Sequence, residues 1–308
     1  MDLTPANLRA LRTTFNSQFR QGYDNAETFY QDVCTMVSSS TSQNDYGWMT
    51  QLPKMREWLG ERVLHNLGVH SYTLKNKRWE LSFAVNRDDI LDDNLGIYSE
   101  IAAAHGEAAR QHPDELVTDL IEAGTSSLCF DGQYFYDTDH PVSKHHSALG
   151  TYSNNLTSTA LTQDNFMTAY TTMRKYKDDA GRLLGVRPNV LAVPPDLEFT
   201  ARKIVAMPTI LTAVAGTDTD ASSPANVTQG VCRVVVLPRL TSSTAWYLLD
   251  TSRRIKPFVF QTREPVKFVS KTQDRDDNVV YQNEYHWLAT ARYNAGYTLP
   301  FLALRAVA

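Results

Sequence analysis

Residues Ile97–Ala123 read IYSEIAAAHGEAARQHPDELVTDLIEA, and this stretch decides the fold of the 308-residue chain. Its apolar residues recur at helical spacing. They are Ile97, Ile101, Ala104 and Ala108, then Leu116, Val117, Leu120 and Ile121. A helix of this length spans roughly 40 Å at 1.5 Å per residue, whereas an ordinary globular helix has about 11–12 residues. We therefore expect another long element beside it.

The ends of this helix are marked by residues that favour caps. Asp92, Asp93 and Asn94 are candidates for the N-cap, and Gly124 is a candidate for the position after the last turn. Pro113 interrupts the pattern, since proline lacks an N–H and restricts the preceding residue. We expect a kink there, or a second helix that begins at Pro113.

The segment that leads into the helix alternates between apolar and polar residues. Residues His70–Asn86 read HSYTLKNKRWELSFAVN, and Trp79, Leu81 and Phe83 fall on one face of a strand. The polar residues Lys75–Lys77 suggest the tip of a β-hairpin. Because an isolated hairpin is only marginally stable in water, we expect it to join a larger sheet or to be supported by a neighbouring chain.

Composition indicates a globular protein with a sizeable core in one or two domains, because 42% of the residues are hydrophobic and 21% are charged. The net charge of -4 leaves no overall basic surface for nucleic acid. Cys34, Cys129 and Cys232 are widely spaced, which favours free thiols in a reducing compartment. No apolar run approaches the roughly 18 residues of a membrane span, and no signal peptide is evident. These features predict a soluble protein made in a cytoplasm.

The N-terminal region predicts two helices. Thr4 and Pro5 suit the start of a helix whose stripe is Leu8, Leu11, Phe15 and Phe19. This helix is either an ordinary amphipathic element or an arm that docks on another subunit. The pattern predicts a second helix over Ala26–Val37, followed by a polar loop.

The second half of the chain mixes helices and strands. We expect a helix that starts at Thr162 or Asp164 and another from Asp196 to Val205. The expected strands are Asn189–Val193, Gly230–Leu237, Ala245–Leu249, Lys256–Lys271 and Val279–Tyr293. Ala215–Thr228 has the composition of a flexible surface loop that tolerates insertion. No glycine-rich phosphate loop links these elements, which disfavours a dinucleotide-binding fold.

One segment gathers residue types that could carry chemistry. It is Cys129–Val142, CFDGQYFYDTDHPV, in which Asp131–Gly132 is a turn signal. The acidic and histidine side chains in and after it are Asp137, Asp139, His140, His145 and His146. A hydrolase or metalloenzyme could use such groups, but their spacing is that of neither a zincin helix nor a Cys/His zinc finger. We interpret the segment as a solvated turn, expect no bound metal, and assign no catalytic or cofactor-binding residue.

The recurring theme is elongation, since a long helix, long strands and a projecting hairpin leave apolar stripes and sheet edges that one chain covers poorly. Such parts suit a subunit that is completed by copies of itself.

Several segments resemble the Mu-like phage major head subunits, the gpT family. They are Leu52–Val63 (LPKMREWLGERV), His70–Tyr98, Ala108–Val117 (AARQHPDELV), Phe130–Val142 (FDGQYFYDTDHPV) and Arg187–Glu198 (RPNVLAVPPDLE). The resemblance covers nearly the whole chain in the same order, although no single motif is diagnostic. Another structural phage protein, such as a tail tube or a decoration protein, is the alternative, and such proteins lack the long helix.

The resemblance implies an α+β fold of the Hong Kong 97 capsid type and a division of the chain into parts. These are an N-terminal arm (1–57), an extended E-loop (58–95), a peripheral domain (96–150) with a spine helix at 97–123, an axial domain (151–257), further peripheral strands (258–294) and a C-terminal return to the axial domain (295–308).

The resemblance also implies function and partners. The chain would be a structural major capsid protein of a tailed phage, not an enzyme, without a cofactor or a membrane partner. Its copies would form hexamers and pentamers of an icosahedral shell around double-stranded DNA, assembled in the host cytoplasm and ending in the virion. The implied partners are a portal at one vertex, scaffold, a maturation protease and a possible decoration protein.

Two groups of residues are predicted to make contacts in such a shell. Tyr72, Leu74, Trp79, Leu81 and Phe83 of the expected hairpin would lie across a neighbour's long helix. Arg9, Arg12 and Arg20 would meet DNA phosphates at the inner surface, loosely and without sequence specificity.

Overall fold

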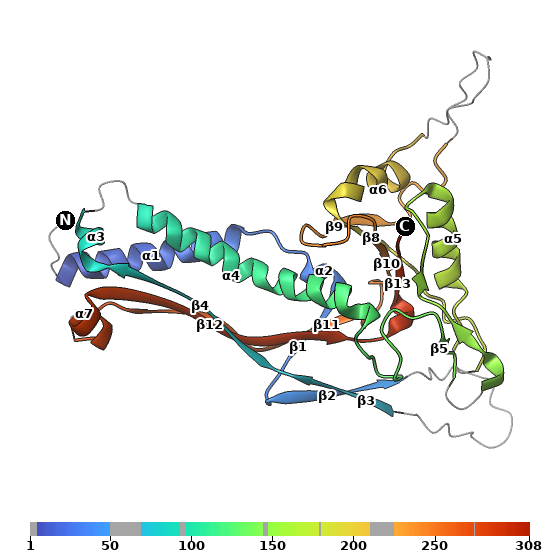
Figure 1. The fold of residues 1–308 in the computed structure, drawn as a ribbon, viewed down its shortest axis with the longest axis horizontal. Coiled ribbons are helices and arrows are strands. Elements are labelled where there is room, and N and C mark those ends of the chain that lie inside the picture. Colours follow the sequence, from blue (N-terminus) through green and yellow to red (C-terminus); the bar gives the residue numbers. More distant parts are fainter. Residues whose placement is uncertain are drawn as a thin grey trace, which may run out of the picture.

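The computed structural model describes residues 5–49, 69–92, 97–143, 147–178, 180–209, 225–273 and 275–308. An elongated sheet runs alongside a long helix, α4 (Ile97–Glu122), and a compact sheet lies near the C-terminal end of that helix (Figure 1). The elongated four-stranded sheet has the order β1 (Cys34–Ser38), β11 (Phe258–Lys271), β12 (Glu284–Tyr297), β4 (Lys77–Asn86). β11, β12 and β4 are antiparallel, and β1 runs parallel to β11 along its edge.

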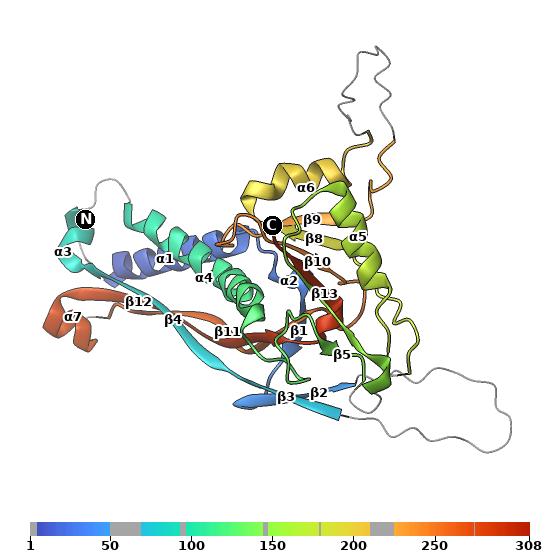
Figure 2. The ribbon, with the colours of Figure 1, turned by 45° about the vertical axis from the view of Figure 1, so that its right-hand side comes forward.

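The compact sheet has five short strands. Their order is β7 (Asn155–Leu156), β13 (Ala303–Ala306), β10 (Trp246–Leu249), β8 (Val190–Val193), β9 (Arg233–Val236). Helices α5 (Gln163–Arg174) and α6 (Glu198–Val205) pack on one face (Figure 2). The other face meets the C-terminal end of α4 and the inner halves of β11 and β12. Because both faces are covered, β8 and β10 are buried at every position, which explains their uninterrupted apolar sequences.

The remaining elements are short. They are α2 (Tyr30–Val33), α3 (Arg87–Asp92), α7 (Asp277–Gln282), β2 (Gln43–Met49), β3 (Val69–Lys75), β5 (His140–Pro141) and β6 (Thr151–Tyr152), with the 3-10 helices η1 (Ala123–Thr125), η2 (Ser147–Leu149), η3 (Pro195–Leu197) and η4 (Pro300–Leu302). After β4 and α4, the chain forms the strands β7, β8, β9 and β10 of the compact sheet. It then forms β11 and β12 of the elongated sheet. Its last strand, β13, again joins the compact sheet.

A long element beside α4 was expected, and it is the helix α1 (Pro5–Asn25), on the same side of the elongated sheet (Figure 1). Phe15 and Phe19 of its predicted stripe are buried. The two helices touch at two glycines: a Cβ added to Gly22 would lie 2.0 Å from the carbonyl oxygen of Ala103, and one added to Gly106 would lie 2.0 Å from that of Phe19. Their backbones are therefore in direct contact.

The expected helix over Ile97–Ala123 is confirmed as α4, but the possible second helix at Pro113 and the predicted buried side were wrong. The helix runs through Pro113 without a second start. The side buried in its first half carries Ala102, Gly106 and Ala109, whereas Ala104 and Ala108 are exposed. Ala104 and Ala108 were predicted to share the buried face because they are apolar. The side that α1 covers is instead the side where Gly106 lets the two helix backbones come into contact.

The predicted hairpin over His70–Asn86 is wrong. β3 and β4 do not pair with each other: β3 pairs with β2, and β4 pairs with β12. Lys75–Lys77 is not a tip but a junction between two ribbons. Asn76 is fixed there, because its side chain donates to Ser39 Oγ and the Thr41 carbonyl and accepts from Gln261 Nε2. The period-2 pattern was correct for a strand, but it does not say which strand is the partner.

Several smaller expectations also need correction. The predicted helix Ala26–Val37 is only the four-residue α2, followed by strand β1. The start of the last predicted strand, at Val279, is helical (α7). In the loop predicted at Ala215–Thr228, Asn226 and Thr228 are buried and both bond to the Ile204 carbonyl, and residues 215–224 lie outside the described residues. The capping candidates Asp93 and Asn94 also lie outside them. Within the described residues, no helix is both long and apolar enough to cross a membrane.

Candidate assembly surface

The inner face of β4 packs on the chain's own long helix. Phe83 lies 4.5 Å from His105 and 5.2 Å from Trp287, measured between ring centroids, and Trp79 lies 4.4 Å from His112. The strand that was expected to lie across a neighbour's long helix therefore contacts the long helix of its own chain. Trp79, Leu81 and Phe83 remain half-buried, and their contact with a neighbour stays a prediction.

Tyr72 and Leu74 lie on β3, where it crosses the inner end of β12. Leu74 is buried, and Tyr72 is half-buried with its ring against Gly296. The β2–β3 ribbon is attached to the sheet by Tyr46, whose hydroxyl donates to Gln261 Oε1 at 2.7 Å. Tyr72 and Leu74 thus support the ribbon inside the subunit, and their contact with a neighbour also stays a prediction.

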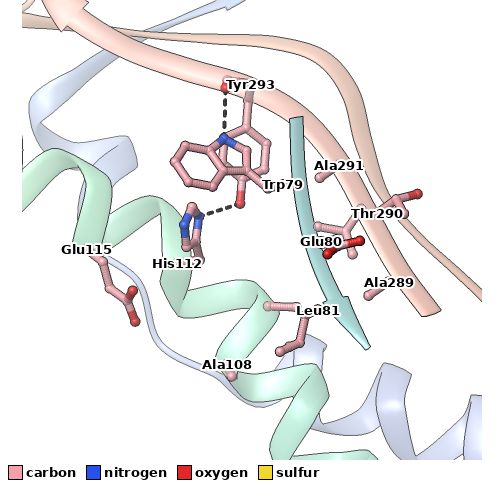
Figure 3. Close-up of a pocket in the computed structure, with 12 residues that line it drawn as sticks. Trp79, Glu80, Leu81, Ala108, His112, Glu115, Ala289, Thr290, Ala291 and Tyr293 are labelled. Atoms are coloured by element: carbon pink, nitrogen blue, oxygen red, sulfur yellow. Dashed lines mark hydrogen bonds between the residues drawn. The ribbon is translucent and has the colours of Figure 1, made fainter. Parts of the chain in front are cut away.

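A cavity of about 210 Å³ opens between α4, β4 and β12 (Figure 3). Its small side chains are Ala108, Ala109, Ala289 and Ala291, and its aromatic side chains are Trp79, His112 and Tyr293. Trp79 Nε1 donates to the Tyr293 carbonyl at 3.0 Å, and the Tyr293 hydroxyl is 2.7 Å from His112 Nδ1. Burial lowers the pKa of His112, which favours the neutral ring, whose unprotonated nitrogen can accept a hydrogen bond from the Tyr293 hydroxyl. The aromatic side chains are therefore fixed around a partly open apolar space.

A larger groove of about 750 Å³ lies between α1 and the outer half of β11. Phe19 and Phe268 stack at 4.0 Å between ring centroids, and Val269 is exposed beside them. The polar rim consists of Asn16, Arg20, Asp24 and Lys267. An apolar centre with a mixed polar rim is typical of protein contacts.

The three arginines expected to meet DNA are on α1. Arg12 and Arg20 are exposed, and Arg20 lines the groove beside β11. Arg9 is in the helix, but its side chain lies outside the described residues. Their role at an inner surface stays a prediction.

The acidic and histidine segment is not the solvated turn that was expected. His140 is fully buried, and its Nδ1 lies 2.7 Å from Asp131 Oδ2. Cys129 Sγ donates to Asp131 Oδ1, so the three groups lie within 4.8 Å of one another. Burial acts to raise the pKa of Asp131, but hydrogen bonds from His140 and Cys129 outweigh it, and the pKa lies below its usual value.

The other members of that segment do not join this cluster. Asp137 Oδ1 accepts from the Thr138 N–H, and His145 and His146 lie outside the described residues. Asp139 is exposed. The turn at Asp131–Gly132 is confirmed, with Gly132 at φ +91°. The hydrogen bonds of Asp131 are satisfied without a metal, and the absence of a metal in solution stays a prediction.

Sequence reasoning missed Asp114, which joins α4 to the N-terminal region. Its carboxylate accepts three hydrogen bonds, of 2.8 to 3.2 Å, from the N–H groups of Phe29 and Tyr30 at the start of α2. Burial raises its pKa to about 6, against the lowering effect of these bonds. A polar residue directly after Pro113, on the side of the helix that faces the core, was the only available signal.

Comparison with known proteins gives consistent results. The family model "Mu-like prophage major head subunit gpT" matches residues 8–160, 156–240 and 217–307. The chain is 30% identical over 297 residues to the "Major capsid protein" of Escherichia phage Mu, covering 96% of this chain and 72% of that protein.

Solved structures agree with the sequence relatives. A chain of the procapsid of bacteriophage JBD30 has 32% identity and a TM-score of 0.59, covering 99% of this chain and 76% of that one. A chain of the JBD30 capsid decorated with minor capsid protein trimers has 29% identity and a TM-score of 0.58, covering 78% and 99%. These similarities confirm the expected α+β phage capsid fold.

Proposed function

Because this chain belongs to the family of Mu-like prophage major head subunits, we propose that its copies form the hexamers and pentamers of an icosahedral shell around double-stranded DNA. It is a major capsid protein of a tailed phage, a structural protein rather than an enzyme. The observation that carries the proposal is the match to a procapsid subunit over 99% of the chain.

Within the shell, we propose that the compact sheet with α5 and α6 is the axial domain (151–257 with the C-terminal return 295–308). The peripheral domain would contain the spine helix α4, part of 96–150, and the strands of 258–294. The N-terminal arm would cover 1–57. For the E-loop, first placed at 58–95, the pairing of β2 (43–49) with β3 (69–75) supports an E-loop that includes these two strands, which would shorten the arm to 1–42 and leave β4 in the peripheral sheet.

The contact surfaces of this proposal are the half-buried face of β4 and the groove beside α1. An apolar surface of this kind is costly to leave in water, at about 25 cal/mol per Å². Many copies of a modest contact are sufficient to hold a shell together, since each subunit makes and receives it. The predicted contact residues would then stabilise the shell in two ways. They hold β3 and β4 in place within the subunit, and they contact neighbouring subunits directly. These residues are Tyr72, Leu74, Trp79, Leu81 and Phe83.

We propose further partners because the chain belongs to this family. They are a portal at one vertex, scaffold, a maturation protease, a decoration protein and packaged DNA, with assembly in the host cytoplasm and the virion as destination. The JBD30 capsid carries trimers of a minor capsid protein, which supports a decoration partner here. The exposed guanidinium groups of Arg12 and Arg20 support loose contact with phosphates.

Expression of the chain, followed by sedimentation and negative-stain microscopy, tests the proposal. We expect rings or closed shells. A chain that stays monomeric at high concentration, alone and with co-expressed scaffold, would contradict it. An Arg12→Gln variant should still assemble but retain less nucleic acid, and Arg78→Gln on β4 is the matched control for loss of an exposed arginine.

A further inference from the structure

The cavity between α4, β4 and β12 is formed entirely within one subunit (Figure 3). Its volume of about 210 Å³ is larger than that of an engineered apolar cavity of about 150 Å³ that takes up benzene. It is smaller than the roughly 300–1,000 Å³ of a site for a drug-sized ligand. The space therefore suits a molecule of one or two small rings.

Small side chains leave room for such a molecule. Ala108 and Ala109 of α4 and Ala289 and Ala291 of β12 line the space, and each contributes only a methyl group. Ala109 and Ala289 are buried in one cluster with Phe19 of α1, so this part of the wall belongs to the packed core. Because a methyl group has no rotamer that extends into the space beside it, these four side chains cannot fill the cavity.

The aromatic side of the cavity is fixed by hydrogen bonds, drawn as dashed lines in Figure 3. They join Trp79 Nε1 to the Tyr293 carbonyl and the Tyr293 hydroxyl to His112. The Trp79 ring lies 4.4 Å from the His112 ring and 6.2 Å from the Tyr293 ring, measured between centroids. These rings are therefore in place before a ligand arrives, which lowers the entropic cost of binding and offers a further ring a surface to pack on.

The charged groups of the lining are directed to other partners or to solvent. The Glu115 carboxylate forms an ion pair with Arg239. Glu80 is exposed, and because side chains alternate along a strand, it lies on the opposite face of β4 from Trp79. Burial lowers the pKa of His112, which favours its neutral ring. A charged ligand would lose its hydration in this cavity without gaining a partner of opposite charge.

We propose that this cavity binds a small, neutral, planar aromatic molecule of one or two rings, of the size of indole, packed against Trp79 and Tyr293. The site is complete in a single subunit, so the inference does not depend on the proposed shell. A bound ring fills the space between α4 and the elongated sheet. Because the cavity exists only in the folded chain, the ligand stabilises the folded subunit by mass action.

Calorimetric titration of the unassembled chain with indole tests the proposal. Ala108 is exposed and lines the cavity, so Ala108→Leu should occupy the space without disturbing the core. Ala104→Leu adds the same side chain one turn earlier, at an exposed position outside the lining. We expect saturable one-to-one binding by the natural chain and by Ala104→Leu, and at least ten-fold weaker binding by Ala108→Leu. No saturable binding by the natural chain, or equal binding by the two variants, would overturn the proposal.

Protection of an introduced thiol provides an independent test that needs no bulky side chain. Cys34, Cys129 and Cys232 are buried, so a maleimide should react first with the introduced cysteine. Indole should slow this reaction several-fold in Ala108→Cys and leave it unchanged in Ala104→Cys. Indole-3-acetate, which adds a carboxylate to the same ring, should protect Ala108→Cys several-fold less at the same concentration. Equal protection at the two positions would contradict the site, and equal protection by the two compounds would contradict the neutral ligand class.

Discussion

The two sheets differ in how completely one chain covers them. The compact sheet is buried on both faces, and every residue of β8 and β10 is inaccessible to solvent. In the elongated sheet, β11 is fully buried over Phe258–Gln261 and then alternates between partly buried and exposed residues toward the tip. Burial along β11 therefore falls with distance from the compact unit, and we expect neighbouring subunits to cover its outer half.

The largest difference should appear when a tryptophan is removed from each region. Trp246 is fully buried, and its Nε1 donates to the Thr159 carbonyl, whereas Trp79 is half-buried on β4. We expect Trp246→Ala to reduce the free energy of unfolding by about 3–5 kcal/mol and Trp79→Ala by roughly half of that. Urea unfolding of unassembled chain measures both. Equal losses would show that the outer sheet is as complete as the inner one.

A second experiment asks whether the outer region contains any tightly fixed contact. Alanine for glycine inside a helix normally stabilises by about 1 kcal/mol. At Gly106 the added Cβ would lie 2.0 Å from the Phe19 carbonyl oxygen, so α1 and α4 must separate, at a cost of about 1–3 kcal/mol. We expect net destabilisation of Gly106→Ala, with Ala104→Ser on the exposed side of α4 as the control, which should cost only the difference in helix propensity, about 0.5 kcal/mol. A gain in stability would mean that α1 is not docked as described.

The accuracy of the sequence-based predictions also differs between the compact and the elongated regions. Three strands of the compact sheet, β8, β9 and β10, carry strong apolar signals and were predicted close to their observed limits, whereas β7 and β13 were not predicted. The pairing of β3 was not, because an alternating pattern is compatible with any partner strand. The side of α4 that faces α1 was missed because glycine and alanine carry little hydrophobic signal, although they allow the closest approach. His140 was taken as solvated because Asp131, its partner, is nine residues away across a turn.

Asp114 gives a prediction about pH. A carboxyl group with a higher pKa in the folded chain binds more protons when folded, so stability falls as pH rises through that interval. For Asp114 the interval runs from the ordinary pKa of 3.8 to about 6, with burial as the main cause. Asp114→Asn keeps a carbonyl acceptor for the Phe29 and Tyr30 N–H groups without the buried charge. It should therefore gain about 1 kcal/mol relative to the natural chain above pH 6.

The measurement is thermal unfolding of both chains at about pH 5 and about pH 8. The advantage of the variant should be larger at the higher pH, and Asp119→Asn on the exposed side of α4 should show no such trend. A variant that is less stable than the natural chain at both pH values would mean that the three hydrogen bonds outweigh burial, and that Asp114 fixes the N-terminal region through its charge.

The smallest effect on folding should be the most informative about assembly. Val269 is 55% exposed on the outer half of β11, and Leu183 is 57% exposed in the compact unit. Replacing either with serine should change the free energy of unfolding by no more than about 0.5 kcal/mol, as for most surface positions. If neighbours complete only the outer region, Val269→Ser should raise the concentration needed for shell formation while Leu183→Ser leaves it unchanged. Light scattering during assembly measures that concentration. A similar rise in both variants would show that exposed apolar groups contribute wherever they lie, and the burial gradient along β11 would then no longer identify the surface that neighbouring subunits cover.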